Sequence, residues 1–181
     1  MKLWIDRAGW SSTKARGRAA RLDAGDVQSI AVIKFGALGD MLMTRPFLVT
    51  LRERFPGARL TLSTASHYQA GIPEDLVDRV HVCFGKDQRH RSLRETVANL
   101  KELGPHDLVF DLTANARSRW LTMLTRAQLK IGFLPGGRHW RTFVFFYDVA
   151  VPRSDYKFEA ETFLDQLAVL GIEYAWPPRF D

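Results

Sequence analysis

The sequence predicts an α/β fold in which helices cover both faces of a parallel sheet. Three observations lead to this prediction. Short apolar runs alternate with longer segments of helical period, and glycines or prolines separate the two kinds of segment. The first of these runs is continuous in Ile, Ala and Val, as expected for a parallel strand that is covered on both faces. A chain of 181 residues with 46% hydrophobic residues is enough for one domain with a continuous core.

The first strand is expected at residues 29–34, which are rich in Ile, Ala and Val, and a turn containing Gly36 and Gly39 follows it. Further strands are predicted at residues 59–64, 79–84, 107–111 and 130–133. The helical segments are residues 41–55, 92–103, a short helix from about 116, and 159–170. Pro46 lies inside the first of these helices and is expected to kink or restart it.

The charge pattern divides the chain into a basic start and a domain. Lys and Arg outnumber Asp and Glu by 26 to 20, and this net charge of +6 favours anionic partners such as phosphates, acidic sugars or a membrane surface. Residues 1–28 hold six basic and three acidic side chains and little apolar periodicity. We therefore expect residues 1–28 to be a disordered extension of a domain spanning 29–172.

Two further features bear on location and reactivity. The first residues lack the apolar stretch of a secretory signal, and no run approaches the roughly 18 apolar residues of a membrane span, so a cytoplasmic protein is expected. Cys83 is the single cysteine and lies in an apolar stretch, so we expect a buried small side chain rather than a nucleophile.

The turn after the first strand is the strongest candidate for a ligand site. It reads Gly36-Ala-Leu-Gly39-Asp40, and ligands of such sheets bind beyond the carboxyl ends of the strands, where glycines let them approach the backbone. Asp40 has two interpretations. It is a suitable N-cap for the following helix, or it is a catalytic carboxylate at the site. On spacing alone the capping role is favoured.

Other kinds of site are disfavoured by the same residues. The turn has neither the Gly-x-Gly-x-x-Gly of dinucleotide binding nor the Gly-Lys-Ser/Thr of a P-loop, so no bound nucleotide cofactor is predicted. The histidines lack metal-ligand spacing, so no metal is expected either. A nucleic-acid-binding domain is supported only by the net charge, because the aromatic residues do not alternate as in a base-stacking platform.

Four segments, in order, resemble the ADP-heptose:lipopolysaccharide heptosyltransferases, glycosyltransferase family 9. Residues 30–46 resemble the opening of that family, and residues 107–118 resemble its strand that ends in Asp before a polar turn and Arg-Ser. Ile131-Gly132-Phe133 and the helix at 161–172 complete the match. The chain departs from the family at Thr113-Ala114, where many members have Gln-Gly, and at Phe158, where His is common.

This resemblance implies the Rossmann-like N-terminal half of a GT-B glycosyltransferase. It implies that Asp40 is the general base of an inverting heptose transfer from ADP-heptose, the nucleotide-sugar donor, to an inner-core sugar of lipopolysaccharide. The acceptor-binding residues would then be Gly36, Gly39, Asn115, Arg117 and Ser118. Contact with the inner membrane surface would be peripheral.

The same resemblance leaves one alternative open. Residues 173–181 would begin a linker, and the donor-binding half would lie outside these 181 residues. The chain would therefore supply the acceptor-binding half of an enzyme. The alternative is a catalytically inactive acceptor-binding module or a truncated fragment.

Overall fold

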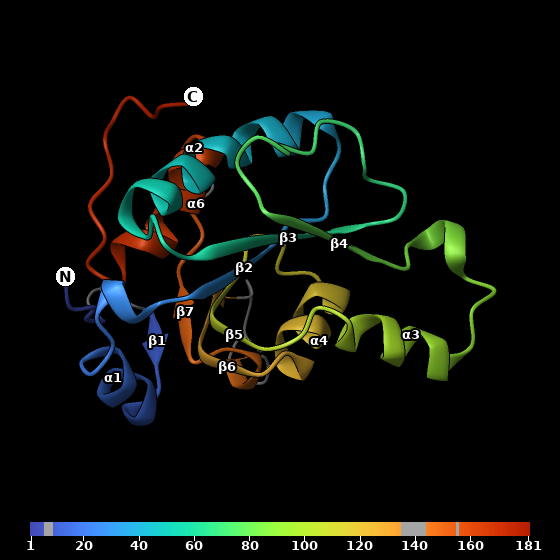
Figure 1. Ribbon diagram of the computed structural model, residues 1–181, viewed down its shortest axis with the longest axis horizontal. Helices are drawn as coiled ribbons and strands as arrows, with labels where there is room; N and C mark the ends of the chain where they lie inside the picture. The colour runs from blue at the N-terminus through green and yellow to red at the C-terminus, as the bar shows by residue number, and fades with distance from the viewer. Residues whose placement is uncertain (6–8, 135–143, 155) are drawn as a thin grey trace.

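The computed structural model describes residues 1–5, 9–134, 144–154 and 156–181. Its centre is a seven-stranded sheet in the order β1-β7-β6-β5-β2-β3-β4 (Figure 1). All neighbouring strands are parallel except β1, which pairs with β7 in the antiparallel sense. The strands are β1 (Trp10–Ser11), β2 (Ser29–Ile33), β3 (Arg59–Ala65), β4 (Arg79–Cys83), β5 (His106–Asp111), β6 (Ala127–Phe133) and β7 (Val149–Val151).

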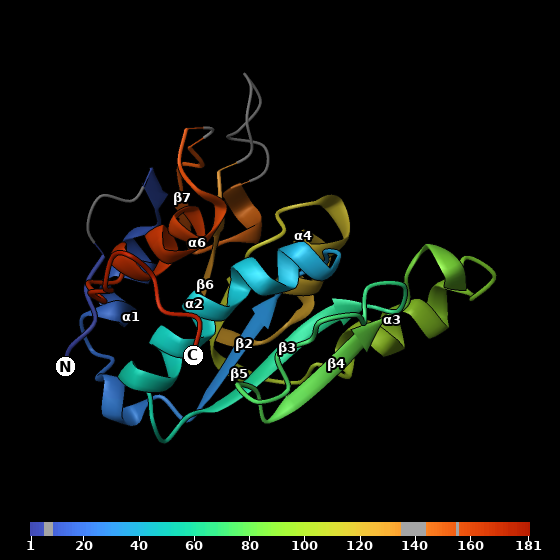
Figure 2. The ribbon, with the colours of Figure 1, turned by 90° about the horizontal axis from the view of Figure 1, so that it is seen from above.

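Helices cover both faces of the sheet, which confirms the predicted three-layer α/β fold. Helices α2 (Leu38–Arg54) and α6 (Glu159–Ala168) lie side by side on one face (Figures 1 and 2). Helices α3 (Leu93–Lys101) and α4 (Ala116–Leu124) lie on the other, and α1 (Thr13–Ala19) lies near the β1 end. In the part of the chain that the structure describes, short 3-10 helices lie at Ala24–Asp26, Lys86–Gln88 and Val144–Phe146.

Alternating residues of β2 belong to two separate cores. Ile30 and Val32 join the core that includes side chains of α2 and α6, whereas Ala31 and Ile33 join the core that includes side chains of α3 and α4. All four side chains are fully buried. This burial on both faces explains why all four of these positions are apolar.

The start of the chain differs from the expected disordered extension. Strand β1 pairs with β7 and forms that edge of the sheet, and Ala15 and Ala19 of α1 are fully buried together with Leu3. Arg18 forms an ion pair with Asp148 in the loop before β7. Strand β1 has only two residues, too few to show a period in the sequence, so its role emerges only when β7 is present to pair with.

Helix α2 also differs in detail from the prediction. It begins at Leu38, three residues earlier than expected, and continues through Pro46 to Arg54 without restarting. Proline removes one backbone hydrogen bond from a helix. The buried side chains of Phe47, Leu48 and Leu51 hold this helix on the sheet in spite of that loss.

The predicted burial of Cys83 is confirmed. Cys83 is fully buried, and burial raises the pKa of its thiol to about 11, which keeps it in the unreactive protonated form at neutral pH. Within the described residues, no helix combines the length and the apolar character that crossing a bilayer requires.

Candidate active site at the carboxyl edge of the sheet

Asp40 lies in the first turn of α2, directly beyond the carboxyl end of β2. Its two carboxylate oxygens have different partners. Oδ2 accepts a hydrogen bond from the Ala37 amide at 3.0 Å, and Oδ1 lies 3.0 Å from the Lys34 ammonium. The side chain is 36% exposed, so the carboxylate is fixed by two donors while solvent or a ligand still reaches it. A carboxylate has about four lone-pair positions, which leaves acceptor capacity for a substrate hydroxyl.

Gly36 makes room for this arrangement. A Cβ atom at position 36 would lie 2.4 Å from the Cβ of Asp40, closer than side chains tolerate. The turn therefore needs glycine at position 36 if Asp40 is to fold back over it. Gly39 has no such requirement, because a Cβ atom there would meet nothing within 4 Å.

Lys34 is a buried cation at the centre of the site. It follows the last residue of β2, and its side chain is only 5% exposed. Its ammonium lies 3.0 Å from Asp40 and 3.3 Å from Oε1 of Glu159, and it stands 4.5 Å from the centre of the Phe163 ring. A buried ammonium is costly unless it is paired, so these contacts compensate for its loss of water.

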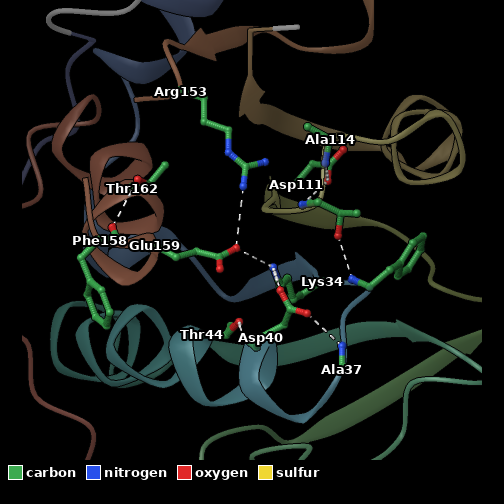
Figure 3. Close-up of polar contacts among 12 residues, drawn as sticks. Lys34, Ala37, Asp40, Thr44, Asp111, Ala114, Arg153, Phe158, Glu159 and Thr162 are labelled. Carbon is green, nitrogen blue, oxygen red and sulfur yellow. Dashed lines mark hydrogen bonds and ion pairs between the residues drawn. The ribbon is translucent and has the colours of Figure 1, made fainter. Parts of the chain in front are cut away.

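Glu159 brings α6 into the same cluster. It is the first residue of α6, and Arg153, in the segment after β7, lies 3.8 Å from its Oε1. Figure 3 shows the side chains of Asp40 and Glu159 directed at the Lys34 ammonium from two different helices. The cluster thus joins the ends of β2 and β7 through the two helices of one layer.

A second turn, after β5, packs against the first. The fully buried carboxylate of Asp111 accepts hydrogen bonds from the Thr113 and Ala114 amides at 2.9 and 2.8 Å. Burial raises the pKa of Asp111, and the bonds that it accepts oppose this rise. The Thr113 hydroxyl in turn accepts from the Phe35 amide at 2.7 Å, which ties the two turns together. Ala114 has a φ of 54°, a conformation that suits glycine better.

The predicted acceptor-binding residues on α4 have separate roles in this structure. Asn115 is the N-cap and accepts from the Ser118 amide at 3.0 Å. Ser118 is fully buried, and its hydroxyl donates to Asp111 at 2.8 Å, so it supports the turn instead of facing a ligand. Arg117 starts at the same sheet edge as Asp40, but its guanidinium donates to the Phe84 carbonyl, just beyond β4.

Sequence reasoning placed Asp40 and Gly36 at the site but gave no role to Lys34 or Glu159. A signal for Lys34 was present, because a lysine that closes an otherwise apolar strand must either leave the core or find a buried partner. Glu159 carries no such signal. An acidic residue in the first turn of a helix is ordinary, since it complements the helix dipole.

Known proteins give matches at the level of structure alone. The chain matches no protein-family model and no curated protein sequence. Two solved structures of the E. coli heptosyltransferase WaaC, one with ADP and one with ADP-2-deoxy-2-fluoro heptose, superpose with a TM-score of 0.69 at 22% identity. A glycosyl transferase family 9 structure from Veillonella parvula superposes with a TM-score of 0.58 at 23% identity.

The chain shares the heptosyltransferase fold. The superpositions cover 82% of this chain with the E. coli enzyme and 84% with the V. parvula protein. They confirm, at the level of fold, the resemblance that the sequence motifs indicated. The chain spans about half the length of these proteins, at 49 to 50% of the E. coli chains and 43% of the V. parvula chain.

Proposed function

We propose that this chain is the acceptor-binding half of a glycosyltransferase, in which Asp40 is the general base. In the proposed reaction, Asp40 takes the proton of an acceptor hydroxyl while that oxygen attacks the anomeric carbon of a nucleotide-activated heptose. The bond from that carbon to the diphosphate breaks on the opposite face, so the configuration inverts. The donor would be ADP-heptose, and the acceptor would be an anionic inner-core sugar of lipopolysaccharide.

The observation that carries this proposal is the position of the Asp40 carboxylate and its two contacts. A partly exposed carboxylate is held by the Ala37 amide and the buried Lys34 ammonium at the edge where sheets of this class bind ligands. A base in fixed position contributes roughly 10²- to 10⁴-fold to a rate. The fold shared with the heptosyltransferases, one of which was solved with an ADP-heptose analogue, supports the substrate class.

The proposal predicts that this chain recognises the acceptor and not the donor. Calorimetric titration with a heptose-free inner-core acceptor should give measurable binding, while ADP should bind weakly or not at all. Transfer is then assayed with ADP-heptose after adding the half of the E. coli heptosyltransferase that this chain does not cover.

Three outcomes separate the possibilities. Acceptor binding together with transfer supports the enzyme. Acceptor binding without transfer, even with the second half present, would instead support a catalytically inactive binding module. Tight binding of ADP by this chain alone would contradict its assignment as the acceptor-binding half.

A further inference from the structure

The Lys34 ammonium is shared between two carboxylates, one of which has no place in the proposed chemistry. Asp40 contacts it at 3.0 Å and Glu159 at 3.3 Å. Glu159 comes from α6, 125 positions along the chain from Lys34. The pair joins two helices that are otherwise linked by apolar packing in the same core.

From this geometry, and resting on the proposed function, we infer that Glu159 is a positioning residue for Asp40 that acts through Lys34. A lysine side chain is a flexible stem with three donors, and one carboxylate alone would let the ammonium pivot. The second carboxylate holds the ammonium from the side of α6. The contact between Lys34 and Asp40 Oδ1, and with it the direction of the base, is thereby fixed.

The charges around the cluster support the same role. Lys34 faces Asp40, Glu159 and the ring of Phe163, and Glu159 also faces Arg153 at 3.8 Å. With Asp40 as its only anion, the buried ammonium would depend on the base alone for charge compensation. Glu159 supplies a second anion from α6, so the ammonium is paired with two carboxylates. Arg153 in turn balances the charge that Glu159 adds.

A matched pair of variants on α6 separates this role from that of an ordinary helix-start carboxylate. Glu159 and Glu161 both lie in the first turn, but Glu161 pairs with Lys157 at 3.4 Å and does not contact Lys34. In the transfer assay, Glu159→Gln should lower kcat about tenfold and change KM less than about twofold, because the base is misdirected while acceptor contacts remain. Glu161→Gln should leave kcat unchanged, and Glu159→Asp, which keeps the charge, should recover part of the loss.

A second measurement does not depend on transfer. Asp40→Asn and Glu159→Gln each leave the buried ammonium with one anion, whereas the double variant leaves it with none. The double variant should therefore be less stable than the two single effects predict, by about fivefold or more in the equilibrium constant for unfolding. In a Lys34→Met background the same two substitutions should become additive.

The outcomes distinguish the two proposals. If the wild-type protein transfers no sugar, or if Asp40→Asn transfers it as fast as the wild type, the proposed function fails. If the effects of Asp40→Asn and Glu159→Gln on the free energy of unfolding are additive while Lys34 is present, the two carboxylates are not coupled through Lys34 and the inference is overturned. If coupling is found but Glu159→Gln matches Glu161→Gln in kcat, Glu159 serves stability alone and its positioning role is wrong.

Discussion

Helices α2 and α3 each have a carboxylate in the first turn that accepts a hydrogen bond from the amide three residues earlier, but only at α3 does the N-cap side chain form a hydrogen bond in return. At α3 the arrangement is reciprocal. The Glu95 carboxylate accepts from the Ser92 amide at 2.9 Å, and the Ser92 hydroxyl accepts from the Glu95 amide at 3.2 Å. At α2 the N-cap is Ala37, which has no side-chain acceptor. The Asp40 carboxylate accepts from the Ala37 amide, but the Ala37 side chain accepts no hydrogen bond from the Asp40 amide.

The two helix starts also differ in their surroundings. At α3 the reciprocal pair of hydrogen bonds between Ser92 and Glu95 is complete and exposed. Glu95 also forms a surface ion pair with Arg91. The α2 start lacks half of the cap, but it holds a carboxylate beside a buried lysine and a glycine that no other residue can replace without a clash. The Asp40 carboxylate therefore does not complete a helix cap, which supports the proposed chemical role for it.

The largest effect that would test this comparison is on turnover. Asp40→Asn should lower transfer by about 10²-fold or more while acceptor binding changes little, because an amide accepts a hydrogen bond but not a proton. The matched change at α3, Glu95→Gln, should leave transfer unchanged. Glu95→Gln should lose no more than roughly 1 kcal/mol of unfolding free energy, measured in urea. Asp40→Asn should lose more, because it also removes one of the two anions beside the buried Lys34. Equal turnover in the two variants would show that Asp40 is a helix cap and nothing more.

A medium effect is expected on stability, with opposite signs at the two helices. Ser92→Ala removes a working cap and should lower the free energy of unfolding by about 1 kcal/mol. Ala37→Ser supplies the missing acceptor at an N-cap whose backbone is already extended, and should raise the free energy of unfolding by about 0.5 to 1 kcal/mol. Chemical denaturation of both variants beside wild type measures the two changes. A loss of stability in Ala37→Ser would mean that the turn cannot accept a hydroxyl.

The smallest effect concerns pH at α3. Hydrogen bonds from the Ser92 amide and hydroxyl hold the pKa of Glu95 below its ordinary value of 4.5. The ionised form is therefore the one favoured in the folded state. Its contribution to stability is present above the ordinary pKa and is lost as the pH falls through the lowered one. Melting temperatures of wild type and Glu95→Gln should converge as the buffer is taken from neutral to acid, and a constant difference would contradict this.

The sequence was a good guide wherever one segment contained its own explanation. The apolar run of β2, the glycine turn and the amphipathic stripe of α6 predicted the strand, the turn and the helix within a few residues. The capping interpretation of Asp40, one of the two that the sequence left open, was wrong by three positions, because the N-cap is Ala37 and the helix starts at Leu38. Ala37 offers no capping side chain, so nothing in the residue types marks the true start.

Residues 1–28 show the limit of local patterns. Strand β1 has two residues and β7 has three, which is too short for either to show a period of its own. Leu3, Ala15 and Ala19 are buried because the rest of the domain provides surfaces for them. Residues 1–28 are basic and show little apolar periodicity, and a disordered tail has the same pattern.

By itself, then, the sequence determined the layer architecture, the edge of the sheet where a site must lie, and the presence of Asp40 at that edge. Each of these follows from residues close together in the chain, whose spacing reports directly on helix or strand geometry. Only the tertiary structure decided that Lys34 is buried, that Glu159 of α6 shares it with Asp40, and that Ser118 faces the core. These facts depend on how distant segments pack, and a charge gives no sign in the sequence of the partner it will meet.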